Sequence, residues 1–205
     1  MLAVLLACTG CASRHDPAAH PVAPETGVQE MRAACKGWLW WDGRKHRFEA
    51  AYAVRPPDSL YAEFAGRIGG TQAILAVTGG HILVLIPGER RFLREEATAE
   101  TFEALFGLRL DAPAVVAILG SAGMKRGFTI DGDASRLAVR VEGDRLRVDP
   151  EGAAAGGFEG LELRFQEIDR PPESPIDDSL FDVTVPDSFV RISLDLDAAG
   201  PLLLP

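Results

Sequence analysis

The chain has 205 residues, of which 47% are hydrophobic and 25% are charged, a length and composition that suit one folded domain. Its 30 aspartate and glutamate residues outnumber the 21 lysine and arginine residues, which gives a formal net charge of -9. This balance argues against a nucleic-acid partner, because phosphate binding requires a basic surface. No apolar run reaches the roughly 18 residues that a membrane-spanning helix needs.

Residues 1–11 resemble the signal and lipobox of a bacterial lipoprotein, in which a cysteine after a small residue is acylated and becomes the mature N-terminus. Leu5-Leu6-Ala7-Cys8 matches such a lipobox, so Cys8 is the preferred lipidation site. Cys11 is the alternative, and it fits less well because a leucine usually stands three residues before the acylated cysteine. The segment departs from a signal peptide in having no lysine or arginine before Arg14, and a start codon assigned too far downstream would account for this.

Residues 12–26 contain Pro17, Pro21 and Pro24 without apolar periodicity, which predicts a flexible tether between the anchor and the folded domain. The cysteine that is not acylated could pair with Cys35 in an oxidising envelope. We expect no structural disulfide, because a tether offers little to hold the required geometry. Cys35 is instead expected to be a small buried apolar residue.

The first part of the folded domain is predicted to be a short helix followed by a β meander. The helix is expected over residues 27–34, because apolar residues recur there at three-residue spacing. The period then becomes two, and Asp42-Gly43 predicts a tight hairpin turn. Further turns between strands are expected at Pro56-Pro57-Asp58, Gly79-Gly80 and Pro87-Gly88. The strand over residues 81–86 is apolar on both faces, so it should be covered on both sides.

Two short helices are predicted to interrupt the strands. Thr98 is a plausible N-cap for the first helix, which Gly107 should end. Asp111 caps the second, with Pro113 in its first turn, and Gly120 should stop it. Both helices are strongly apolar, so each is expected to bury its apolar side chains against the sheet.

Alternating strands then resume, and the last is expected to carry Val190, Ile192 and Leu194 after Phe181, Val183 and Val185. The total is about eleven strands, nearly all joined by hairpins. Because twist curls a sheet of that size, the predicted fold is mainly β: a curved antiparallel incomplete barrel of about eleven strands with short lid helices. Such a barrel can enclose a ligand cavity of several hundred Å³.

The residues of the cavity and its lid are predicted from the positions at which apolar side chains recur along each strand and helix. The strand residues expected to line one concave face are Trp38 or Trp40, Phe48, Phe64, Leu75, Leu137, Val139, Leu163 and Phe165. The helical residues expected to cover its mouth are Phe102, Leu105, Phe106, Val116 and Leu119.

Three landmarks together resemble the LolA/LolB superfamily of lipoprotein carriers and receptors. The first is Gly37-Trp38-Leu39-Trp40-Trp41 with Pro56-Pro57-Asp58-Ser59-Leu60 and Ala65-Gly66-Arg67-Ile68-Gly69-Gly70. The second is the helical insert from Leu105-Phe106-Gly107 to Ile118-Leu119-Gly120. The third is the closing Leu180-Phe181-Asp182-Val183-Thr184-Val185-Pro186. The resemblance covers residues 27–196, with 197–205 as a C-terminal tail.

The resemblance implies a half-barrel that holds the acyl chains of lipoproteins in a hydrophobic cavity. With the lipobox, it implies an outer-membrane protein, lipid-anchored on the periplasmic face, that helps to insert lipoproteins and receives them from a LolA-like periplasmic carrier. Ile68 lies where LolB-like proteins have an exposed apolar residue that contacts the membrane. An Ile68 folded back on the core as a loop anchor is the alternative.

The alternative is that this fold belongs to an envelope lipoprotein that binds another hydrophobic ligand or acts as an assembly or interaction module. An enzyme is not expected. His46 lies among basic residues at a hairpin, His81 has no cysteine or second histidine nearby, and Ser121 lacks the glycine of a nucleophile elbow. We therefore expect no catalytic residue, metal or cofactor, and we expect a monomer.

Overall fold

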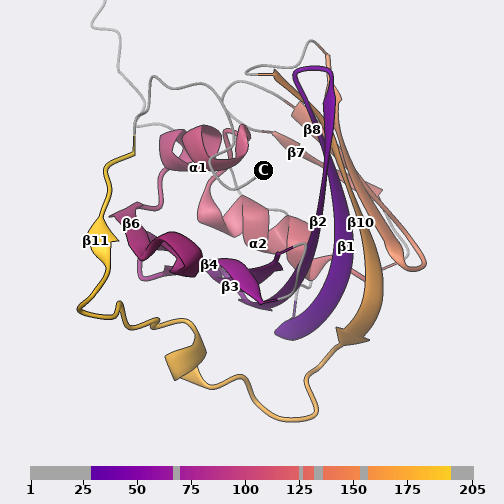
Figure 1. The fold of residues 1–205 in the computed structure, drawn as a ribbon. Helices are drawn as coiled ribbons and strands as arrows, with labels where there is room; N and C mark the ends of the chain where they lie inside the picture. Colours follow the sequence, from indigo (N-terminus) through magenta and orange to yellow (C-terminus); the bar gives the residue numbers. More distant parts are fainter. Residues whose placement is uncertain (1–28, 67–69, 125–126, 132–135, 153–156, 195–205) are drawn as a thin grey trace, which may run out of the picture.

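The computed structural model describes residues 29–66, 70–124, 127–131, 136–152 and 157–194, and within them the fold is one curved sheet around two helices (Figure 1). The sheet has eleven strands in the order β11-β6-β5-β4-β3-β2-β1-β10-β9-β8-β7 and is not closed, since β7 and β11 are its two edges. The first six strands are β1 (Met31–Trp41), β2 (Arg44–Arg55), β3 (Ser59–Ala65), β4 (Thr71–Thr78), β5 (His81–Ile86) and β6 (Arg91–Glu96). The others are β7 (Gly127–Asp131), β8 (Arg136–Glu142), β9 (Arg145–Glu151), β10 (Phe158–Asp169) and β11 (Val190–Arg191). The predicted fold class is confirmed.

Strand β1 lies between β2 and β10 and pairs antiparallel with both. Its odd-numbered residues are buried and its even-numbered residues are half-buried from Met31 to Trp41, which is the alternation of a strand covered on one face. The helix predicted over residues 27–34 is wrong from Met31 onward. Met31 pairs with Val54 of β2, so long-range pairing outweighs the helical spacing of a few apolar residues.

The turns that connect the strands agree closely with the sequence. Asp42 and Gly43 both have positive φ, 46° and 69°, as a two-residue hairpin turn requires. Strands β4 and β5 meet at Gly79-Gly80, and the short helix η1 (Pro87–Glu89) turns β5 into β6. Strand β5 is buried on both faces as predicted: Ile82 and Val84 belong to the main core, Leu83 and Leu85 to a separate cluster on the outer side.

Two helices, α1 (Ala99–Phe106) and α2 (Ala112–Gly120), lie inside the curve of the sheet (Figure 1). Both predicted N-caps are confirmed: the Thr98 hydroxyl accepts from the Thr101 amide at 3.2 Å, and an Asp111 carboxylate oxygen accepts from the Ala114 amide at 2.8 Å. Each cap satisfies one of the amide donors that a helix start leaves free. No helix among the described residues is long and apolar enough to cross a membrane.

Helix α1 ends against the inner face of β1. Gly107 follows the helix with φ of 70°, and a Cβ there would lie 1.4 Å from the Trp41 ring. Glycine is therefore required at this position both for its left-handed backbone and for the close approach of the indole. This contact fixes α1 to the end of β1.

The segment from Arg170 to Phe189 crosses the outer side of the sheet, from the end of β10 to β11 (Figure 1). We call this segment the strap. Its Ile176 and Phe181 pack on Ala53 of β2, and its Val183, Val185 and Phe189 join the cluster of Leu83 and Leu85. It contains one short helix, η3 (Asp178–Leu180).

The end of the described chain differs from the prediction. Phe181, Val183 and Val185 lie in no strand, and the last strand covers only Val190–Arg191 instead of continuing to Leu194. This strand pairs parallel with β6, Val190 beside Arg91 and Arg191 beside Phe92. The reason is the strap: because the chain crosses the sheet before returning, it does not form a hairpin with the strand before it.

Candidate functional site

A partly enclosed pocket of about 150 Å³ lies between the concave face of the sheet and the two helices. No polar surface is exposed in its walls. The sheet contributes twelve of the lining residues, which are Cys35, Leu39, Phe48, Ala50, Tyr52, Leu60, Ala62, Phe64, Leu75, Val148, Leu161 and Leu163. The helices and the link between them contribute Phe102, Phe106, Leu108, Leu110, Val115, Ile118 and Leu119.

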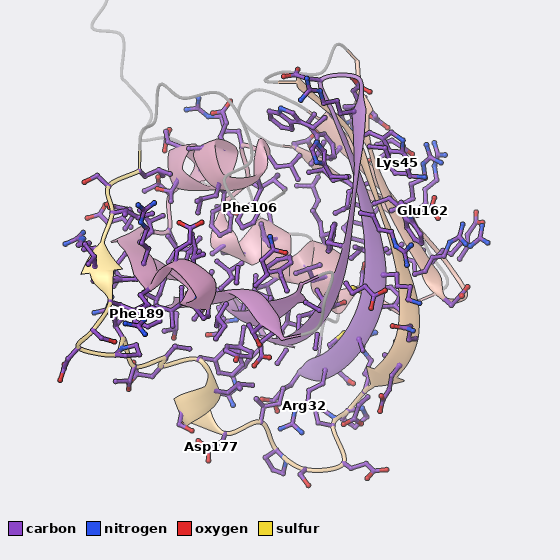
Figure 2. All side chains as sticks on the ribbon, viewed as in Figure 1. Arg32, Lys45, Phe106, Glu162, Asp177 and Phe189 are labelled. Carbon is purple, nitrogen blue, oxygen red and sulfur yellow. The ribbon has the colours of Figure 1, made fainter. Side chains whose placement is uncertain are left out.

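The aromatic residues that narrow the pocket come from neighbouring strands and from α1. The rings of Phe48 and Phe64 lie 5.8 Å apart between centroids. The rings of Phe102 and Phe106 lie 6.0 Å apart, and Figure 2 shows Phe106 pointing into the curve of the sheet. Gly37 makes room for this arrangement on β1, since a Cβ there would lie 2.1 Å from the Phe48 ring.

The polar groups nearest the pocket are satisfied or uncharged. The Tyr52 hydroxyl donates to the Leu119 carbonyl at 3.0 Å, which joins β2 to the end of α2. Burial raises the pKa of Tyr52 well above its usual value. Burial also raises the pKa of the Cys35 thiol to about 12, against a smaller lowering effect of a backbone hydrogen bond with Ala50. The pocket is therefore uncharged at neutral pH, and it suits a hydrocarbon better than any polar ligand.

Four of the predicted cavity residues line the pocket: Phe48, Phe64, Leu75 and Leu163. Leu137, Val139 and Phe165 are buried in the same core cluster but do not form its wall. Among the predicted lid residues, Phe102, Phe106 and Leu119 line the pocket, whereas Leu105 and Val116 are buried in the core without reaching it. Helix α2 is apolar on most sides, so its sequence does not tell which residues face the pocket.

The prediction for β1 needs a correction. Trp38 and Trp40 lie on the outer face of the sheet, and Leu39 and Cys35 line the pocket instead. The sequence does indicate which residues of β1 face the pocket. A two-residue turn at Asp42-Gly43 places Gly37 opposite Phe48, and directly opposed residues of two strands share a face.

Three predicted residues lie outside the described part of the chain: the lipidation candidates Cys8 and Cys11, and the loop residue Ile68. Among the described residues, no group of three or more His, Cys, Asp and Glu side chains could hold a metal ion.

Comparisons with known proteins give likenesses of structure alone. No protein-family model matches the chain, and no curated protein matches its sequence. One similar solved structure is an uncharacterized conserved protein from Thermus thermophilus, with 8% identity, a TM-score of 0.41, and coverage of 83% of this chain and 94% of that one. Another is a candidate outer membrane lipoprotein-sorting protein domain from Vibrio parahaemolyticus, with 6% identity, a TM-score of 0.44, and coverage of 76% and 90%. At such scores neither likeness bears on what this chain does.

Proposed function

We propose that this protein binds an acyl chain of a lipid or lipoprotein in the pocket between the sheet and the two helices. The observation that carries the proposal is the pocket wall, which exposes no polar surface although it opens toward solvent. A site of that kind favours an apolar ligand, because such a ligand gives up no hydrogen bonds when it leaves water. Each buried methylene group stabilises the complex by about 0.8 kcal/mol.

The cellular role we propose is insertion of lipoproteins into the outer membrane by a protein that is lipid-anchored on the periplasmic face. The lipobox at Leu5-Leu6-Ala7-Cys8 and the resemblance to the LolA/LolB superfamily support it. In this role a LolA-like periplasmic carrier delivers the cargo, the pocket holds its acyl chains without any catalytic step, and the Ile68 loop contacts the membrane.

A pocket of 150 Å³ is small for this cargo. It resembles in size the cavities that hold one small apolar molecule. Longer or multiple acyl chains therefore require α1 and α2 to move away from the sheet. The small volume also favours a second candidate function, an envelope lipoprotein that binds a smaller hydrophobic ligand or acts as an assembly module.

A fluorescent fatty acid titrated into the purified protein tests the proposal. Ala50 and Ala51 are neighbours on β2 that face opposite sides: Ala50 lines the pocket and Ala51 is exposed. Ala50→Phe should weaken binding about tenfold, the equivalent of roughly two excluded methylene groups, and Ala51→Phe should bind as the wild type does. Equal affinities for all three proteins, at matched melting temperatures, would place the fatty acid elsewhere and end the proposal.

The proposed anchor has a separate test. Cys8→Ser should move the protein from the membrane pellet to the supernatant of fractionated cells, because a serine is not acylated. If Cys11→Ser releases the protein and Cys8→Ser does not, the alternative cysteine carries the lipid. If neither change releases it, the lipid anchor is wrong.

A further inference from the structure

The outer surface of β1, β2, β8, β9 and β10 carries two rows of side chains that run across the strands. The register places Arg47, Trp38, Glu162, Arg147 and Arg140 in one row. It places Glu49, Lys36, Arg164, Arg145 and Glu142 in the next. We call these two rows, with the adjoining Lys45, Trp40 and Asp149, the cationic face. Figure 2 shows Lys45 and Glu162 on this outer side, away from the helices.

The cationic face carries the opposite charge to the molecule as a whole. It presents seven lysine or arginine side chains beside four carboxylates, on a chain with a formal net charge of -9. The strap does not contribute to it: the strap's apolar residues pack on the outer side of β2 to β6, at Ala53, Ala76 and the Leu83 cluster.

Two of the four carboxylates on the face are covered by arginines, whereas Glu142 and Glu49 are more exposed. The side chains of Glu162 and Asp149 are 15% and 22% exposed, whereas those of their partners Arg164 and Arg147 are 46% and 56% exposed. Each arginine therefore covers the carboxylate that it pairs with and still projects N–H groups outward. Glu49 is an exposed carboxylate on this face, and it is shared between Lys36 at 3.8 Å and Arg47 at 3.4 Å.

Two tryptophans of β1 hold cations on the face. The Lys45 ammonium lies 5.0 Å from the centroid of the Trp40 ring and 5.6 Å from that of Trp38. The Arg164 guanidinium lies 4.9 Å from the Trp38 ring centroid. Lys45 forms no ion pair with a carboxylate of the described residues. Cation–π contacts of this kind restrict both side chains, so the cations are placed in advance of any partner.

We propose that the cationic face binds an acidic segment of a partner protein, whose carboxylates pair with Lys45, Arg47 and the arginines of β8, β9 and β10. Tryptophan and arginine together are typical of the centre of protein interfaces. Charge complementarity would steer the encounter.

The shape of the face favours a protein over an anionic membrane. The face lies on the convex side of the curved sheet (Figure 1), so a flat bilayer would touch only its crest, whereas a peptide can follow it. The Trp38 and Trp40 rings are also covered by Lys45 and Arg164. Tryptophans at a membrane–water interface insert their rings among the lipid headgroups. Trp38 and Trp40 would have to break their contacts with these cations to do the same.

The test uses the full chain and a labelled probe peptide of about ten residues in which glutamate alternates with serine. The control probe has glutamine in place of glutamate. We expect the acidic peptide to bind, with an affinity that falls as salt is raised, and the control peptide not to bind.

Lys45→Glu should weaken binding of the acidic peptide at least about tenfold. The matched control is Arg91→Glu on β6, which makes the same change of charge at an exposed arginine outside the face, and it should change binding by no more than about twofold. Arg164→Gln, a milder change, should weaken binding in the same direction and keeps the test valid if Lys45→Glu impairs folding. Fatty-acid binding should be unchanged in these variants, because the pocket lies on the opposite face.

Three outcomes would overturn the proposal. The first is no binding of the acidic peptide by the wild type. The second is equal weakening by Arg91→Glu, which would show a net-charge effect without a site. The third is that the acidic peptide does not bind while Lys45→Glu weakens binding to vesicles of phosphatidylglycerol and phosphatidylcholine, which would make the face a membrane contact.

Discussion

Cys35 shows how one side chain keeps the pocket apolar. It lies on the inner face of β1, and burial raises its pKa to about 12. The thiol is therefore protonated throughout the neutral range and behaves as a small apolar group. A thiolate at this position would put a charge in the pocket wall.

The pKa of Cys35 predicts how stability changes in alkaline solution. The folded pKa is above the ordinary value of 9.0, so the stabilisation is fully present below pH 9 and is lost as pH rises toward 12. Between these values the unfolded chain releases a proton that the folded chain keeps, which lowers the free energy of unfolding by up to about 1.4 kcal/mol per pH unit.

Urea unfolding from pH 8 to pH 11 measures this slope. Cys35→Ala removes the titrating group and should make the decline shallower, although not flat, because the raised pKa values of Tyr52 and Tyr61 act in the same direction. A decline as steep in Cys35→Ala as in the wild type would show that the thiol does not contribute.

The face of β1 that lines the pocket differs from the prediction. The alternation over residues 35–41 of β1 agrees with the prediction, but the bulk of Trp38 and Trp40 points to the wrong face. Tryptophan is large enough to cover a surface as well as fill a core, so size does not fix the face. The hairpin register does fix it, because Phe48 lies opposite Gly37 and both face the pocket.

At the scale of elements, local chemistry determines the helices. Thr98 and Asp111 cap α1 and α2, and Gly107 ends α1, all as predicted. These signals depend on residues within one turn, so one sequence is enough to read them. Which side of α2 faces the pocket depends instead on where Tyr52 of β2 meets the Leu119 carbonyl, a contact between distant parts of the chain.

The strap could not be predicted, because its partners are far away in the sequence. Arg55 at the end of β2 joins it to the sheet: the guanidinium bonds to Glu30 at 2.9 Å, to the Asp178 carboxylate and to the Ile176 carbonyl. The same group lies 4.8 Å from the Phe181 ring centroid. Alternating apolar residues at Phe181, Val183 and Val185 look like a strand, yet they cover the outer side of the sheet without joining it.

In the molecule as a whole, the two faces of the sheet differ in chemistry. The concave face and the helices form an apolar pocket. The convex face is covered by the strap from Ala53 of β2 to β6, and it exposes cations over β1, β8 to β10 and the Lys45–Glu49 end of β2. The sequence predicted the curvature from strand number and twist, and from the curvature a cavity. The pocket, at about 150 Å³, is smaller than the several hundred Å³ expected of such a site, because its volume depends on how far Phe102, Phe106 and Leu119 reach into the space.

The proposed ligand of this pocket is an acyl chain. Its position can be measured with a fatty acid that carries a photoactivatable diazirine near its methyl end. The probe is cross-linked to the purified protein, and the labelled residues are located by mass spectrometry of peptides. We expect labels on Phe48, Tyr52, Phe106 and Leu163, which line the pocket, and we expect excess unlabelled fatty acid to abolish them. Labels that persist under competition, or that fall on the convex face around Trp38 and Trp40, would contradict this expectation.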